Sequence, residues 1–149
     1  MRFSLLLLSA LGLATPAFAD ELPVTAEFAA QPKFASAYHA MSTLPPWVSG
    51  LKATSVPVEK TSIDGKPYLL GHMCKPHDCA DYQLEVIFTP DGHKAWGFLS
   101  VVNNGALYQM PLGEPTQPVL EALKAAYNTN NPDRPGSGSS TGKTAPASP

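Results

Sequence analysis

Several features that would indicate an enzyme are missing from this chain of 149 residues. It contains no nucleophile motif such as G-x-S-x-G and no glycine-rich phosphate loop. No pair of carboxylates stands out by its spacing, and the only two cysteines are too far apart for the C-x-x-C motif of thiol oxidoreductases. We therefore expect no enzymatic activity and no cofactor.

Long apolar segments and an excess of positive charge are missing as well. The apolar run over residues 3–13 is too short to span a bilayer, and no stop-transfer pattern follows it. The formal net charge is −2 at pH 7, which argues against binding to nucleic acid or to anionic membrane surfaces. We expect neither a nucleic-acid partner nor a membrane span.

The N-terminus instead has the pattern of a secretion signal. Arg2 precedes the apolar run, and Ala17-Phe18-Ala19 forms an A-x-A cleavage pattern before Asp20. We therefore predict a signal peptide over residues 1–19, and no cysteine follows the cleavage pattern to carry a lipid. Removal of Arg2 changes the formal charge to −3, and export brings both cysteines into an oxidising compartment.

The C-terminal residues 131–149 lack aromatic and branched aliphatic side chains and are rich in Pro, Gly, Ser and Thr. Such a segment cannot bury enough apolar surface to offset its chain entropy, so we predict a disordered tail. Residues 20–130 remain, which is enough for one domain with one small core.

Helical periodicity in the first part of this domain predicts one apolar face, formed by Phe34, Ala37, Tyr38 and Met41. Pro32 suits the first turn of that helix, and Thr25 is placed to cap a short turn before it. The prolines at 45 and 46 end the helix by residue 44. Trp47 and Val48 are then expected to pack on the core from an irregular segment.

Turn signals divide the middle of the chain into five predicted strands, at residues 55–61, 67–73, 82–88, 94–102 and 106–110. The sequence Asp64-Gly65 indicates a hairpin between the first two. Apolar and polar side chains alternate over residues 82–88, whereas residues 94–102 are apolar on both faces, which predicts a central strand. Turns are predicted at 89–92 and at 103–105.

A second helix follows, with Thr116 as its N-cap and Pro118 in its first turn. Its apolar face is expected to contain Leu120, Leu123 and Tyr127. The order of elements is therefore helix, antiparallel meander, helix. It predicts an α+β fold, with an antiparallel sheet of about five strands and helices from both ends of the chain packed on one face.

The two cysteines, Cys74 and Cys79, bracket a very short segment between the second and third predicted strands. If they pair, they close a small ring with His77 near its tip. Pro76 has a fixed φ angle and limits the ring further, and Asp78 can orient the imidazole or cap the turn. The ring would thus present one imidazole, able to donate or accept a proton near neutral pH, on a stiff projection.

Two other interpretations of this region remain open. In the simpler one, His77 is a solvated loop residue beside a structural disulfide. In the other, the imidazoles and sulfurs of the region bind copper or zinc, the candidates being His72, Cys74, His77, Cys79 and His93. Their spacing fits none of the usual zinc patterns, and oxidised cysteines offer no thiolates, so we assign no metal ligand.

The run Cys-Lys-Pro-His-Asp-Cys at residues 74–79 is followed by Tyr-Gln-Leu-Glu-Val-Ile-Phe at residues 82–88. Together with the apolar strand before it, this run resembles the Ivy family, the inhibitors of vertebrate lysozyme. The secretion signal and the mildly acidic α+β domain also match. The resemblance covers most of residues 20–130 and is most specific at residues 68–102.

The resemblance implies a periplasmic inhibitor of c-type lysozyme in a Gram-negative bacterium. In that family a disulfide-closed loop enters the lysozyme cleft, and its histidine reaches the two catalytic carboxylates. Carried over to this sequence, His77 is the inserted side chain, Lys75, Pro76 and Asp78 are flanking contacts, and Cys74 and Cys79 form the clamp. The family includes dimers, so a homodimer is possible, but no residue pattern identifies a dimer face. The alternative is a periplasmic glycan- or metal-binding module that uses the same loop.

Overall fold

A computed structural model describes residues 21–41 and 45–134. The expected signal peptide lies outside the described residues, as does the part of the predicted tail over residues 135–149. The helices are α1 (Thr25–Ala30), α2 (Pro32–Met41), α3 (Pro46–Ser49) and α4 (Gln117–Asn130). The strands are β1 (Thr54–Ser55), β2 (Glu59–Ile63), β3 (Lys66–Cys74), β4 (Tyr82–Phe88), β5 (Ala95–Asn103) and β6 (Ala106–Leu112).

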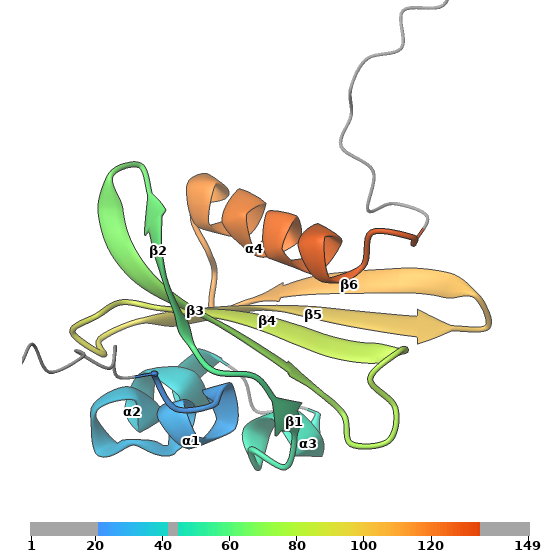
Figure 1. Ribbon diagram of the computed structural model, residues 1–149, viewed down its shortest axis with the longest axis horizontal. Coiled ribbons are helices and arrows are strands. Elements are labelled where there is room, and N and C mark those ends of the chain that lie inside the picture. Colours follow the sequence, from blue (N-terminus) through green and yellow to red (C-terminus); the bar gives the residue numbers. More distant parts are fainter. Residues whose placement is uncertain (1–20, 42–44, 135–149) are drawn as a thin grey trace, which may run out of the picture.

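One antiparallel sheet organises the domain, and its strand order is β1-β3-β4-β5-β6, with β2 also paired to β3 (Figure 1). The predicted α+β class and the antiparallel meander are confirmed. The strand predicted at residues 55–61 is divided into β1 and β2, because Pro57 stands between them in an isolated bridge with Val24. Proline has no N–H to continue a ladder. The sheet therefore has six strands.

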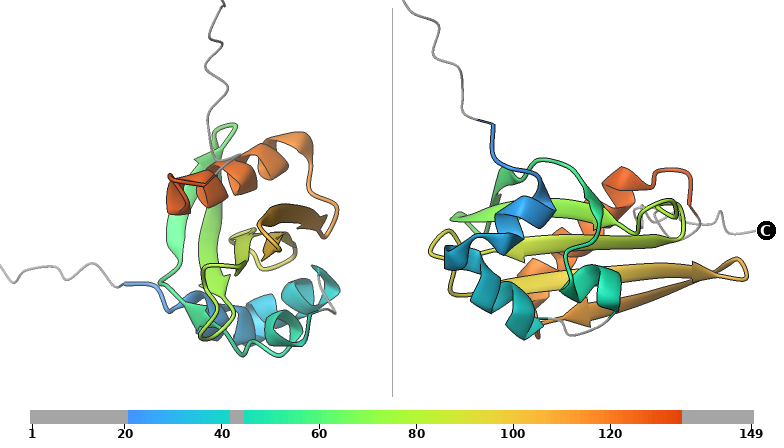
Figure 2. Two further views of the ribbon diagram at one scale, coloured as in Figure 1. Left: turned by 90° about the vertical axis from the view of Figure 1, so that its right-hand side faces the viewer. Right: turned by 90° about the horizontal axis from the view of Figure 1, so that it is seen from below.

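The helices lie on both faces of the sheet, which corrects the expectation that they share one face (Figures 1 and 2). Helices α1 and α2 pack with Leu84, Val86 and Phe88 in one apolar cluster. Helix α4 packs in a second cluster with Ile87 and Phe98. The physical reason is that β4 is buried on both sides from its second residue onward, so each face of the sheet needs a cover.

The turns follow the predictions from glycine and proline. Asp64 and Gly65 both have positive φ angles, 50° and 72°, as a two-residue hairpin turn requires. Asn104 and Gly105 do the same between β5 and β6, at 50° and 77°. In the turn after β4, the N–H of Gly92 donates to the carbonyl of Thr89 at 2.9 Å.

Two local predictions are wrong, and one is incomplete. The Thr25 side chain caps no helix; it is buried, and its hydroxyl donates to the carbonyl of Val56 at 3.0 Å. Val48 packs on the core from the short helix α3 and not from an irregular segment. In α4 the predicted face of Leu120, Leu123 and Tyr127 does pack on the core, but it also includes the buried Val119, which the prediction omitted. Thr116 is the N-cap residue as predicted, although its side chain makes no cap bond. Within the described ranges, no helix is long and apolar enough to cross a membrane.

The Tyr38 side chain joins helix α2 to helix α3 in the core. It is fully buried, and its hydroxyl donates to the carbonyl of Val48 at 2.9 Å. Burial raises the pKa of the Tyr38 hydroxyl far above its ordinary value. The folded state therefore keeps this group neutral at pH values where the unfolded chain ionises it.

We predict that Tyr38→Phe makes the protein less sensitive to alkali. The tyrosine contribution to stability is fully present below about pH 10 and is lost as pH rises above that value, because only the unfolded state gives up the proton. The advantage of the wild type over Tyr38→Phe should therefore shrink by about 1 kcal/mol between pH 10 and pH 11. Urea unfolding of both proteins at pH 8, 10 and 11 measures this. A constant difference across that range would contradict the prediction.

Candidate functional site

The connection between β3 and β4, residues 75–81, forms a loop at one end of the sheet. It projects from the face of the sheet that carries helices α1 to α3, below β4 in Figure 1. Cys74 and Cys79 are joined by a disulfide, with their Cα atoms 4.8 Å apart, which confirms the predicted pairing. The N–H of Lys75 also donates to the carbonyl of Tyr82 at 3.1 Å, so the loop is closed at its base by a backbone bond as well.

The tip of the loop is a tight turn over residues 75–78. The N–H of Asp78 donates to the carbonyl of Lys75 at 3.0 Å, with Pro76 second and His77 third in the turn. His77 has a φ angle of 63°. A type II turn requires a positive φ at the third position and often has proline at the second, and this turn has both. His77 thus has a backbone conformation that residues other than glycine seldom adopt.

Two charged side chains at the tip of the loop, Lys75 and Asp78, are paired with each other. Lys75 Nζ lies 3.0 Å from Asp78 Oδ2 and 4.2 Å from the centre of the Tyr82 ring. The side chain of His77, in contrast, is exposed and makes no hydrogen bond or ion pair within the described part of the chain. The loop therefore fixes its own backbone and charges and leaves one imidazole available to a partner.

A buried polar network supports the strands that lead into the loop. Glu85 on β4 is 1 % exposed, and its Oε1 atom lies 2.8 Å from Nδ1 of His72. The side-chain amide of Asn130, the last residue of α4, donates to the same oxygen at 3.0 Å. His72, which entered the sequence analysis as a metal-ligand candidate, is therefore engaged with a carboxylate under helix α4.

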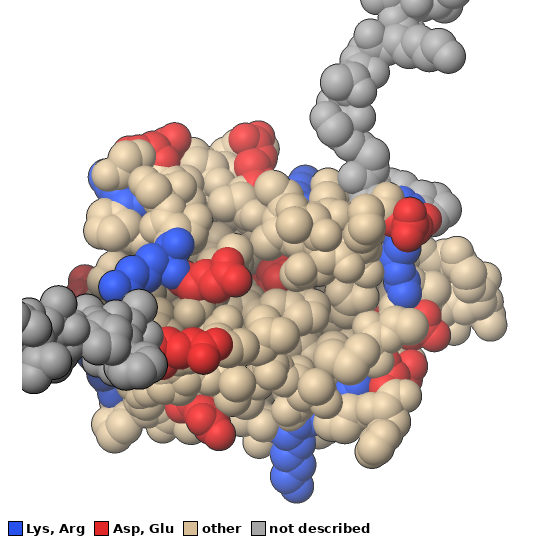
Figure 3. Space-filling model, in the orientation of Figure 1, with Lys and Arg blue, Asp and Glu red and all other residues tan. Residues whose placement is uncertain are grey.

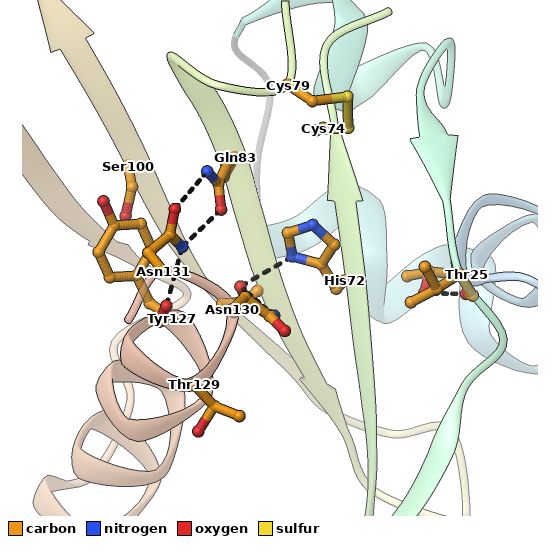
Figure 4. A network of polar contacts seen from close by, with 12 residues as sticks. Thr25, His72, Cys74, Cys79, Gln83, Ser100, Tyr127, Thr129, Asn130 and Asn131 are labelled. Atoms are coloured by element: carbon orange, nitrogen blue, oxygen red, sulfur yellow. Dashed lines mark hydrogen bonds and ion pairs between the residues drawn. A yellow bond between two sulfur atoms is a disulfide. The ribbon is translucent and has the colours of Figure 1, made fainter. Parts of the chain in front are cut away.

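A second polar contact lies two residues closer to the loop along β4, at Gln83. The side-chain amides of Gln83 and Asn131 exchange two hydrogen bonds, each 2.8 Å long (Figure 4). Asn131 also donates to the carbonyl of Tyr127 in the last turn of α4. Both amides are buried, so this reciprocal pairing satisfies groups that would otherwise be costly to desolvate.

Arg134, which follows α4, contacts the loop directly. Its guanidinium donates to the carbonyl of Ala80 and lies 3.8 Å from the carboxylate of Asp81. The carbonyl of Asp81 in turn accepts from the N–H of Val102 at 2.8 Å. The base of the loop is thus held by the chain after α4 and by strand β5.

Sequence reasoning missed this support. Asn131 and Arg134 fall in the predicted disordered tail, residues 131–149, yet Asn131 is 7 % exposed, and its side-chain amide is hydrogen-bonded through both its nitrogen and its oxygen. The available signal was the polarity of Gln83 and Glu85 on a strand with apolar neighbours. Buried polar side chains on such a strand require partners from another element.

The structure separates the remaining candidate ligand, His93, from the loop. It is exposed in the turn at the opposite end of β4. Within residues 21–41 and 45–134, no three His, Cys, Asp or Glu side chains are grouped as metal ligands. The predicted loop residues Lys75, Pro76 and Asp78 do lie together with His77.

Comparison with known proteins agrees with the loop motif. The family described as inhibitor of vertebrate lysozyme (Ivy) matches residues 35–129. The chain is 38 % identical over 136 residues to the inhibitor of vertebrate lysozyme of Pseudomonas aeruginosa. The aligned region covers 80 % of this chain and 89 % of that protein. An uncharacterised protein of Yersinia pestis is 29 % identical over 128 residues, 76 % of this chain and 82 % of that protein.

The matched residues include the disulfide loop, the strands on either side of it and nearly all of helix α4. On this match, the chain belongs to the family of inhibitors of vertebrate lysozyme.

Proposed function

We propose that this protein inhibits c-type lysozyme by placing the His77 side chain between the two catalytic carboxylates of the enzyme. The main support for this proposal is the exposed imidazole of His77 at the tip of a disulfide-closed turn. Within the described chain this imidazole has no hydrogen-bond or ion-pair partner. A relative of 38 % identity bears the name inhibitor of vertebrate lysozyme. In this proposal the chain performs no chemistry and acts by occlusion.

The chemistry of the target suits an imidazole. Lysozyme keeps one catalytic carboxyl protonated in an apolar pocket and the other ionised. A neutral imidazole accepts a hydrogen bond from the first and donates one to the second, and a protonated imidazole pairs with the ionised carboxylate. In either state His77 occupies the space that the sugar substrate requires. A desolvated contact of this kind contributes about 2–5 kcal/mol when measured by truncation.

The conformation of the loop reduces the entropic cost of binding. The type II turn, the disulfide and the pairing of Lys75 with Asp78 already hold the backbone in one form. A pre-organised segment loses little freedom on docking and therefore binds more tightly. In this proposal Pro76 shapes the tip, while Lys75 and Asp78 flank the inserted imidazole.

The cellular setting follows from the sequence. We infer that the leader at residues 1–19 directs export to the periplasm, where a lysozyme that attacks the cell wall would be encountered. The formal charge of −3 after cleavage favours encounter with a basic enzyme at low salt.

We predict that His77→Ala weakens inhibition of a c-type lysozyme at least about tenfold, which corresponds to about 1.4 kcal/mol. His77→Asn should do the same, and asparagine tolerates the positive φ angle, so this variant separates loss of the imidazole from backbone strain. His93→Ala is the matched control, because His93 is equally an exposed histidine in a turn but lies at the other end of β4. A lytic assay titrated with each protein gives the inhibition constants. Undiminished inhibition by folded His77→Asn would refute insertion of the imidazole.

We further predict that removing the disulfide weakens lysozyme inhibition less than removing the His77 imidazole does. The Cys74→Ser, Cys79→Ser double variant keeps His77 but relaxes the turn, so inhibition should weaken by less than in His77→Ala. The ring is small, and its loss should cost about 2 kcal/mol of unfolding free energy. Inhibition constants and urea unfolding of the double variant test both parts. If loop amide exchange and inhibition were both unchanged, pre-organisation would not be the role of this bond.

A further inference from the structure

The hairpin formed by β5 and β6 carries no charged residue. Lys94 and Glu114 stand at its two ends, and nothing between them is Lys, Arg, Asp or Glu. The hairpin projects from the same end of the sheet as the disulfide loop, and its tip shows only uncharged residues in the space-filling view (Figures 1 and 3).

Two large apolar side chains of this hairpin are exposed. Tyr108 is 60 % exposed and Met110 is 51 % exposed, and both lie on β6, the edge strand of the sheet. Soluble proteins usually protect an exposed edge with charged side chains, which β6 lacks. Pro111 does interrupt the edge as a partner for another strand, because it has no N–H. Pro111 thus accounts for the protected backbone edge of β6, but nothing in the fold accounts for the exposed side chains of Tyr108 and Met110.

The register of the sheet places these side chains beside the loop. Tyr82 at the loop base pairs with Val101, and Val101 pairs with Tyr108. Met110 pairs with Leu99, which belongs to the apolar cluster under α1 and α2. Directly paired residues project to the same face, so Tyr108 and Met110 face the side from which the loop hangs. Two strand spacings separate Tyr82 from Tyr108, about 10 Å.

The two surfaces are also joined by backbone contact. Val102 on β5 donates to the carbonyl of Asp81 in the loop at 2.8 Å. The loop and the hairpin therefore keep a fixed relative position. A typical partner covers about 800 Å² of each protein, a patch about 30 Å across. Because Tyr108 lies about 10 Å from Tyr82 at the base of the loop, a partner of that size bound over the loop also reaches the hairpin.

We propose that Tyr108 and Met110 form a second, apolar contact with the same lysozyme molecule whose active site His77 enters. Tyrosine and methionine are enriched, and charged residues depleted, in the centres of protein interfaces. The loop supplies the polar contact at the catalytic groups, and the uncharged face of β6 packs against the protein surface bordering the cleft. This inference rests on the proposed function and extends it from the loop to the hairpin.

The test is the affinity of the Tyr108→Ser, Met110→Ser double variant for a purified c-type lysozyme, measured by calorimetry and by the lytic assay. We expect the dissociation constant to rise at least about fivefold, as for the loss of buried interface side chains. The matched control is Val56→Ser, because Val56 is 48 % exposed but lies next to β1, at the opposite edge of the sheet. It should leave affinity unchanged, and the two single variants show which side chain contributes more.

The outcomes separate this inference from the function itself. If the wild type and the folded double variant inhibit equally, the second contact is refuted and insertion of His77 stands. If the wild type neither binds nor inhibits lysozyme, the inference and the proposed function both fail. Light scattering after size exclusion identifies a different occupant. A wild-type dimer that the double variant loses, with lysozyme affinity unchanged, would assign the surface to a second copy and overturn the inference.

Discussion

Burial of strand β4 on both of its faces is the constraint on which the rest of the structure depends. Its residues 83–88 are all buried, although two of them are Gln83 and Glu85. One face is covered by α1 and α2, and the other needs α4. The buried amide and carboxylate then require polar partners, which come from His72 and from residues 130 and 131 at the end of α4. The fold thus ties the end of the domain to the strands that carry the loop.

The disulfide loop is held in place by this arrangement. Its base is fixed by the disulfide, by a backbone bond to β4, by a bond to β5 and by Arg134. A ring this small adds only about 2 kcal/mol through chain entropy, so its main effect is on shape. The strained φ angle of His77 is maintained because the surrounding bonds determine the turn. The loop presents its imidazole in one conformation before any partner arrives.

The end of the molecule that carries the loop combines two kinds of surface. The loop has paired charges and one available imidazole, whereas the neighbouring hairpin has no charge and two exposed apolar side chains. Polar groups give an interface its register, and buried apolar and aromatic groups supply most of the binding free energy. The same end of the sheet therefore offers both kinds of contact to a single partner.

The sequence alone was enough to predict the meander between two helical regions, the hairpin turns and the disulfide loop with His77, because glycine, proline and cysteine act over a few residues. It also indicated the family, since the six-residue loop motif is local. Three features became known only from the folded chain: α4 covers the face opposite α1 and α2, Asn131 is buried, and β6 lies beside the loop. These facts depend on which distant segments meet. Alternation along β4 shows that its two faces differ, but it cannot show that both are covered.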